Sequence, residues 1–200
     1  MPAELPLTTR LNILLPSLIL WVAHYFVINR LGGRNRPRTD WSTRLDAAIP
    51  FIPQSAIVYL STYPFGLLPF ILVPETKLFT AAAYGYLIIT AVSAIINMVF
   101  PSQVRRVEDL NPDGISSILL GRYQRLCRPY DNFPSTHVAY SVVVVGTAYL
   151  AWGPDTGSVF LLWAFLIAIS TMTTKQHYLV DVASGGALGL GVFLLVMRFT

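Results

Sequence analysis

The amino-acid sequence predicts an all-α protein, a bundle of six transmembrane helices. Hydrophobic residues make up 54% of its 200 residues and charged residues only 12%, whereas soluble domains carry about 25% charged residues. The mean hydropathy is +0.57. A helix needs about 20 mostly apolar residues to cross a bilayer, and six segments approach that length: 11–29, 51–73, 78–100, 134–152, 158–174 and 179–198. We therefore expect residues 1–200 to form one membrane-embedded domain.

The individual segments carry signals of their own. The first, 11–29, lacks a basic start and runs to membrane length, so we expect a retained anchor and not a cleaved signal peptide. The second contains Pro53, Pro64 and Pro69, which predict a kink or a break. Segments 78–100, 134–152 and 158–174 qualify by length and apolar composition. The last carries Gly185 and Gly189, and small residues four apart favour close helix packing.

Six crossings divide the loops between two faces of the membrane. Loops 30–50, 101–133 and 175–178 share one face, and the termini share the other with the short loops 74–77 and 153–157. The first face carries eleven of the fourteen basic residues: Arg30, Arg34, Arg36, Arg38, Arg44, Arg105, Arg106, Arg122, Arg125, Arg128 and Lys175. The excess of positive charge predicts that this face is cytoplasmic. Loop 30–50, which includes Trp41, could also touch anionic lipid.

Two polar breaks in the apolar chain carry the candidate chemistry, because ionisable groups are costly at the ends of membrane segments. His177 and Asp181 are four residues apart, so on a helix their side chains share a face. An aspartate at one imidazole nitrogen leaves the other free to act as nucleophile or general base. His137 starts another segment on the same face and could protonate a leaving oxygen. Ser135 and Thr136 precede it at a helix start, where anions bind.

The same loops supply positive charge. Arg105 and Arg106 follow the third segment, and Lys175 precedes His177 by two residues. Guanidinium groups match phosphate oxygens and stabilise charge that develops at phosphorus. Two histidines, an aspartate and several cations at a membrane surface therefore indicate phosphoryl transfer on a lipid phosphate. A metal site built from His137, His177 and Asp181 remains open by ligand type.

At these residues the chain resembles the type 2 phosphatidic acid phosphatase superfamily of membrane lipid phosphatases and phosphotransferases. The second family motif, Pro-Ser-Gly-His, corresponds to residues 134–137, and His177 and Asp181 keep the spacing of the third. The resemblance covers nearly the whole chain. It implies a phosphohistidine on His177, Asp181 as its orienting partner, His137 as acid, and Ser135 at the phosphate. It also implies a lipid phosphate or diphosphate substrate and no metal or other cofactor.

Two departures from the family pattern narrow the resemblance. Thr171 stands where the third motif has arginine, and Lys175 could replace that phosphate ligand. The first motif has no clean match, but residues 101–106 resemble the variant form of the inositol phosphorylceramide synthase branch, with Arg106 as the favoured ligand. That branch also shares the Asn132-to-His137 pattern. The chain therefore resembles the synthase-like branch more than the ordinary phosphatases.

Several functions remain open at this stage. Hydrolysis is favoured over transfer to a lipid alcohol because water needs no second binding site. Other readings are a non-enzymatic lipid carrier or scramblase, and a serine hydrolase using Ser135 with His177, which lacks the strained turn such nucleophiles need. Membrane lipids, and not nucleic acid, are the expected partners. The resembling enzymes mostly face the exterior or lumen, in conflict with the charge count.

Overall fold

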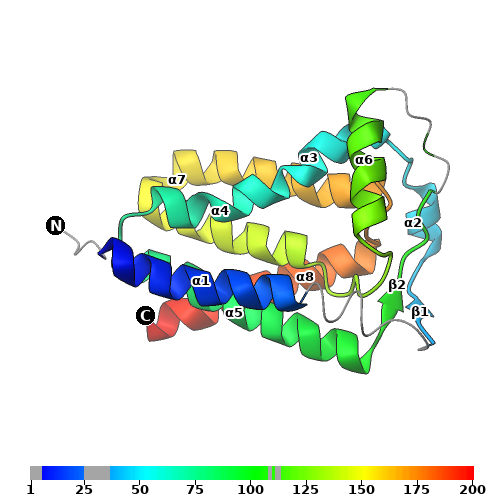
Figure 1. The fold of residues 1–200 in the computed structure, drawn as a ribbon. Coiled ribbons are helices and arrows are strands. Elements are labelled where there is room, and N and C mark those ends of the chain that lie inside the picture. The colour runs from blue at the N-terminus through cyan, green and yellow to red at the C-terminus, as the bar shows by residue number, and fades with distance from the viewer. Residues whose placement is uncertain (1–5, 25–36, 108–109, 111–113) are drawn as a thin grey trace.

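The computed structural model describes residues 6–24, 37–107, 110 and 114–200, and these form a mainly helical bundle (Figure 1). The long elements are α1 (Leu7–His24), α5 (Thr76–Val99), α7 (Thr136–Thr173) and α8 (Leu179–Phe199). Shorter ones are α2 (Arg44–Ala48), the 3₁₀ turn η2 (Pro53–Ser55), α3 (Ala56–Leu60), α4 (Thr62–Leu72) and α6 (Ile115–Leu126). Two-residue strands β1 (Thr39–Asp40) and β2 (Ser102–Gln103) pair in parallel.

Among the described residues, four helical stretches are long and apolar enough to cross a membrane. They are Pro53–Leu72, Thr76–Val99, Thr136–Thr173 and Leu179–Phe199. The expected first span is represented by the 18 residues of α1, and its last part, 25–29, lies outside the described residues. The chain is thus a helical membrane protein with four candidate spans in its described part.

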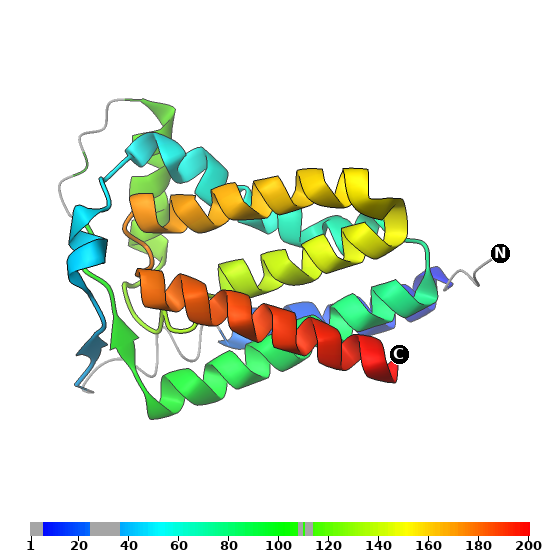
Figure 2. The same ribbon diagram turned by 180° about the vertical axis from the view of Figure 1, so that it is seen from behind.

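One of these stretches, α7, covers two of the expected segments. Gly153 interrupts it with a φ of 83°, a conformation that glycine adopts readily. The two halves run side by side in opposite directions (Figures 1 and 2), and the hydroxyls of Tyr149 and Ser158 lie 2.9 Å apart across the bend. The halves coincide closely with 134–152 and 158–174.

The proline-rich stretch is broken, as the sequence predicts. Residues 53–72 form η2, α3 and α4 in succession, with Ser61 at the junction of the two α-helices. Pro53 begins η2, where a missing N–H costs nothing, and Pro69 lies inside α4. This broken helix brings Tyr59 of α3 beside the start of α7.

The core lies among α5, α7 and α8, around buried residues such as Phe79, Ile89, Ala139, Val143, Val192 and Val196. Large apolar side chains on the outside stay exposed, including Ile95 (58%), Leu162 (60%) and Leu194 (61%). Apolar patches of this extent are typical of a surface that contacts lipid. The glycines of α8 pack closely against α7: a Cβ on Gly189 would lie 2.5 Å from the Ala139 carbonyl oxygen.

The loops expected on a common face meet at one end of the bundle, the right-hand end of Figure 1. Thr39 pairs with Ser102, and Gln103 forms a bridge with Tyr130. The Ile52 N–H donates to the Thr173 carbonyl at 2.9 Å. The start of α1 and the end of α8 lie at the opposite end (Figures 1 and 2). The described parts of the three loop regions are therefore in contact, whereas residues 30–36 of the first lie outside the described part.

Candidate active site

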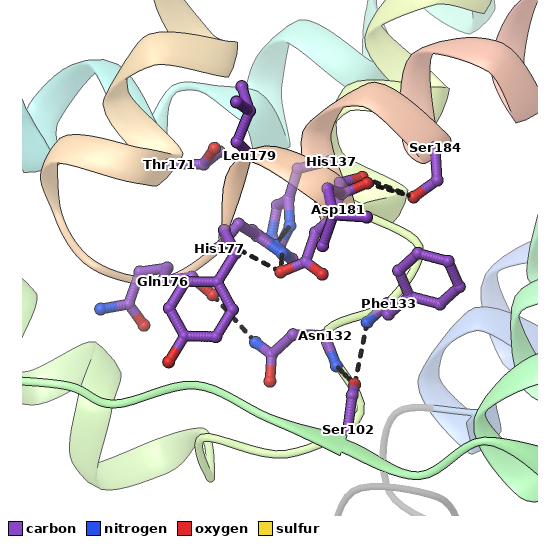
Figure 3. A network of polar contacts seen from close by, with 12 residues as sticks. Ser102, Asn132, Phe133, His137, Thr171, Gln176, His177, Leu179, Asp181 and Ser184 are labelled. Carbon is purple, nitrogen blue, oxygen red and sulfur yellow. Dashed lines mark hydrogen bonds and ion pairs between the residues drawn. The ribbon is translucent and has the colours of Figure 1, made fainter. Parts of the chain in front are cut away.

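The two histidines singled out in the sequence are in direct contact. Nδ1 of His137 lies 3.1 Å from Nε2 of His177, close enough for one proton to be shared between them (Figure 3). His137 lies in the first turn of α7, and His177 lies in the short loop between α7 and α8. Only 5% of the His177 surface is exposed. The fold thus brings a buried His177 against a half-buried His137 at the loop end of the bundle.

Asp181 lies on the other side of His177. Its Oδ2 is 3.5 Å from Nδ1 of His177, an ion-pair distance slightly too long for a hydrogen bond. The expected reason for this contact, a shared helix face, is wrong. His177 precedes the N-cap Tyr178, and Asp181 turns back to accept the Tyr178 N–H at 2.8 Å. The capping geometry of α8, rather than helix periodicity, brings the carboxylate to the imidazole.

The segment before His137 is fastened to α8. The Ser135 N–H donates to the Asp181 carbonyl at 2.9 Å. The Ser135 side chain is fully buried, and its hydroxyl has no hydrogen-bond partner among the described residues. Ser135 is the N-cap of α7, yet its side chain caps no N–H group. A buried hydroxyl and uncapped N–H groups beginning at Thr136 therefore lie next to the histidines, where an anion could satisfy them.

Three residues without an assigned role hold this arrangement together (Figure 3). The Ser102 hydroxyl accepts the N–H groups of Asn132 (2.9 Å) and Phe133 (3.1 Å). The Asn132 side-chain amide donates to the Gln176 carbonyl at 3.0 Å. Ser102 and Asn132 belong to motifs recognised in the sequence, but nothing in the pattern shows that they join all three motif segments. These contacts align the His137 and His177 loops with β2.

Tyr59 is a site residue that sequence reasoning missed. Its hydroxyl lies 3.4 Å from Nε2 of His137 and donates to the Tyr123 hydroxyl at 2.5 Å. His137 therefore has a partner at each ring nitrogen, Tyr59 at Nε2 and His177 at Nδ1. The only available signal was the proline-broken span, since nothing local marks Tyr59 as different from the other aromatic residues.

Arg106 points inward and Arg105 points outward. The Arg106 guanidinium donates to the Cys127 and Arg128 carbonyls, lies 6.0 Å from the Tyr123 ring centre, and keeps a buried Nε without a hydrogen-bond partner. The Arg105 side chain is 82% exposed and forms a 2.6 Å ion pair with Asp40. Of the two, Arg106 lies on the histidine side, beside the Tyr123–Tyr59 pair.

A small cluster around Arg105 touches the residue that follows His177. The Tyr178 hydroxyl accepts the Arg105 backbone N–H at 2.9 Å, and the Arg105 side chain pairs with Asp40. Burial raises the pKa of Tyr178, and Asp40 raises it further. Burial alone would raise the pKa of Asp40, but hydrogen bonds from Ser42 and Tyr178 and the Arg105 charge together lower it. A neutral tyrosine beside an ionised carboxylate thus links β1, β2 and the start of α8.

The ammonium group of Lys175 is engaged with α2. It donates to the carbonyls of Asp46 (3.0 Å) and Ile49, and Lys175 has a positive φ of 56°. The buried Asp46 carboxylate also accepts the Leu179 N–H at 2.7 Å. The Lys175 ammonium and the Asp46 carboxylate therefore both connect the His177 loop to α2. Nothing in the sequence signals this connection.

Comparison with known proteins shows the family of the chain. The family model of the PAP2 superfamily matches residues 10–200, almost the entire chain. The chain belongs to the PAP2 superfamily. Members of this superfamily are generally phosphatases or phosphotransferases that act on lipid phosphates, so a function of that type follows from membership. No curated protein matches the sequence significantly.

The backbone of Thr171 lies against the loop that carries His177. Thr171 is fully buried at the end of α7, and its carbonyl accepts the N–H groups of Gln176 (2.9 Å) and His177 (3.1 Å). The Thr171 backbone therefore closes the loop that holds His177. In the part of the chain that the structure describes, no group of three His, Cys, Asp or Glu side chains is arranged to hold a metal ion. His137, His177 and Asp181 instead form a row.

Proposed function

We propose that this PAP2 protein is a membrane lipid-phosphate phosphohydrolase that acts through a phosphohistidine on His177. The supporting observation is the row Asp181–His177–His137, with contacts of 3.5 and 3.1 Å at the two nitrogens of the central ring. Asp181 favours the proton on Nδ1 of His177, which leaves the Nε2 lone pair for attack. His137, next to that nitrogen, is the proposed general acid.

The reaction proceeds in two balanced steps. In the first, Nε2 of His177 bonds to phosphorus, the bond from phosphorus to the lipid oxygen breaks, and protonated His137 gives its proton to that oxygen. In the second, water attacks the phosphohistidine, the P–N bond breaks, and His137 takes a proton from the water. Since Nδ1 of His137 lies 3.1 Å from Nε2 of His177, phosphorus can reach Nε2 only if the two rings move apart. Neither step requires a metal ion.

The proposed phosphate site consists of Ser135, Thr136 and three cations. Ser135 contributes its buried, unpartnered hydroxyl, and Thr136 contributes an N–H group at the start of α7. Arg106 is the main cation because its guanidinium lies on the histidine side of the loops. Arg105 would have to exchange Asp40 for phosphate, and Lys175 would have to leave the α2 carbonyls. We therefore expect Arg106 to contribute most to phosphate binding, Arg105 less and Lys175 least.

The membrane arrangement that this site requires is six crossings. We assign them to α1 with the residues that follow it, the stretch 53–72, α5, the two halves of α7, and α8. All loops that build the site then share one face in a multi-pass membrane protein. Labelling of an Ala47→Cys variant in intact cells with a membrane-impermeant maleimide decides which face this is, since Ala47 is exposed on α2.

Phosphate release from a labelled lipid phosphate by purified protein tests the function. We expect release by the wild type, none by His177→Ala, and retention of ³²P on wild-type protein after rapid acid-free quenching. Asp155→Asn is the matched control, because Asp155 is exposed at the α7 bend, at the other end of the bundle. Activity that survives a chelator supports metal independence. Phosphate release that survives His177→Ala would refute the phosphohistidine on His177, whereas lipid movement without phosphate release, unchanged in His177→Ala, would favour the carrier or scramblase.

A phosphotransferase is the second candidate, because Thr171 and the Asn132-to-His137 pattern resemble the inositol phosphorylceramide synthase branch. Both reactions share phospho-His177 and differ in whether water or an alcohol resolves it. The assay is therefore repeated with ceramide, diacylglycerol and inositol. Phosphate release that no acceptor changes excludes transfer to these acceptors, and a labelled lipid product formed at the expense of free phosphate identifies a transferase.

A further inference from the structure

Helix α6 carries an exposed stripe with no function in the proposed reaction. Its members recur at intervals of three or four residues and occupy about a third of the helix circumference. We call this the outer stripe of α6; it consists of Ile115, Ile118, Arg122, Arg125 and Leu126. The apolar members are 73%, 42% and 64% exposed in chain order, and both arginines are exposed. Three large apolar side chains and two cations thus share one open face.

The opposite face of α6 is fixed to the protein. Ser117 and Leu120 are buried, and the Tyr123 hydroxyl accepts a hydrogen bond from Tyr59 at 2.5 Å. The helix packs on α3 and η2, which belong to the broken membrane stretch. Since the inner face is occupied, α6 cannot rotate to bury the outer stripe. The described residues of the fold leave Ile115 and Ile118 exposed on this outer face.

The orientation of α6 identifies its surroundings. The long helices run along the bundle, whereas α6 lies across their direction at the end where the site loops gather (Figures 1 and 2). A helix perpendicular to membrane spans, at their end, lies parallel to the bilayer surface. Helices at that depth bury apolar side chains to the level of the acyl chains and hold basic side chains among the headgroups. The outer stripe has this composition.

We propose that the outer stripe of α6 is a docking surface for anionic phospholipid. Ile115, Ile118 and Leu126 reach the acyl-chain boundary, and Arg122 and Arg125 bind lipid phosphates, with their stems along the apolar surface. The arginines argue for an anionic lipid because each basic residue at a negative surface adds attraction that salt screens. The proposal needs only a membrane-embedded bundle, so it stands apart from the reaction assigned to His177.

Depth measurements on a labelled α6 test this directly. Ile118→Cys carries an environment-sensitive fluorophore in a Cys127→Ser background, Cys127 being buried and the chain's single cysteine. Protein is placed in nanodiscs of phosphatidylcholine, with or without phosphatidylglycerol. Leu194→Cys serves as the lipid reference and Ala47→Cys as the aqueous one. We expect emission at position 118 to shift to shorter wavelength with phosphatidylglycerol and to be quenched by lipid-borne quenchers more than by iodide.

Charge variants then test the partner. Arg122→Gln with Arg125→Gln should remove most of the phosphatidylglycerol-dependent shift, whereas Arg198→Gln, an exposed arginine at the far end of α8, should leave it unchanged. High salt on unaltered arginines should weaken the shift and gives the same information if the double variant does not fold. Iodide quenching equal to that at position 47 would overturn the docking surface. If lipid-borne quenchers reach the label at position 118 but phosphatidylglycerol does not change its emission, the outer stripe binds lipid without a preference for anionic lipid, which would refute the anionic partner.

Discussion

The carbonyl oxygen of Ser135 occupies the space that a side chain on Gly185 would need: a Cβ there would lie 2.3 Å from that oxygen. One turn earlier on α8, the Asp181 carbonyl accepts the Ser135 N–H. The close approach of the two helices therefore depends on a residue without a side chain. Through it, the His137 segment rests directly on the turn that carries Asp181.

Gly185→Ala should accordingly destabilise the protein. The obstructing atom is backbone, so the α7–α8 contact must open, and overpacking of this kind typically costs about 1–3 kcal/mol. We expect a lower thermal unfolding temperature in detergent together with reduced phosphate release. Gly191→Ala is the control, because a Cβ there meets nothing within 4 Å. Equal unfolding temperatures for the two variants would contradict the packing argument.

The row of three ionisable groups predicts the largest losses of activity. His177→Ala and Asp181→Ala should each lower the rate by at least about a hundredfold, as removal of nucleophilic or orienting groups does. Asp181 also caps α8, so Asp181→Asn, which retains an acceptor oxygen, separates the two roles. Activity lost with normal unfolding in Asp181→Asn indicates orientation of His177, whereas recovery of activity indicates that capping alone matters.

The two arginines after α5 should not be equivalent. Arg106 is partly buried against the Cys127 and Arg128 carbonyls, and Arg105 is exposed and paired with Asp40. Arg106→Ala should therefore lower kcat by a larger factor than Arg105→Ala, in assays with saturating lipid phosphate. Circular dichroism of both variants separates loss of chemistry from loss of the loop. Equal, mild effects for both arginines, His177 and Asp181 would refute the site assignment.

The hydrogen bonds to the Asp46 carboxylate predict that the stability of the protein depends on pH. Burial alone would raise the pKa of Asp46, but hydrogen bonds from Thr43 and from the Leu179 N–H outweigh it and lower the pKa below 3.8. A lowered pKa in the folded state contributes stability above pH 3.8, and that contribution is lost as pH falls through the folded pKa.

The contribution of the Asp46 carboxylate to stability is measured by the unfolding temperatures of the wild type and Asp46→Asn between neutral pH and pH values below 3.8. At neutral pH the variant should lose about 1.5–3 kcal/mol of stability, the usual contribution of a hydrogen bond to a charged group. The difference should shrink as the wild-type carboxyl becomes protonated. Asp155→Asn is the control with an exposed carboxyl. A difference that stays constant with pH would show that the Asp46 charge contributes nothing.

Tyr59→Phe should impair His137 without affecting the nucleophile. Loss of one hydrogen bond of about 1 kcal/mol at Nε2 of His137 would cost about fivefold in kcat. We also expect the pH profile of kcat to move, because the partner of the proposed acid has changed. Tyr84→Phe, which removes a hydroxyl from a half-exposed tyrosine of α5, is the matched control. An unchanged profile with a lower unfolding temperature would assign Tyr59 to packing.

The features of this protein that the sequence predicted are those that depend on local composition. Long apolar runs predict helices because a membrane leaves the backbone no other partner for its polar groups. The prolines of 53–69 predict a broken helix because each removes an N–H, and the structure confirms the break. Counting of the crossings predicted that His137 and His177 lie on the same face, and the contact between the two rings agrees with this expectation.

Contacts between segments distant in the chain were decided only by the tertiary structure. Asp181 meets His177 through the cap of α8, since the helix begins two residues after His177. Tyr59, Ser102 and Asp46 join the site from α3, β2 and α2, and no periodicity records such pairings. Residue order thus determined the chemistry available at this end of the bundle, because the ionisable groups are few. The packing of α7 against the glycines of α8 decided which nitrogen, hydroxyl or carboxylate lies next to each of these ionisable groups.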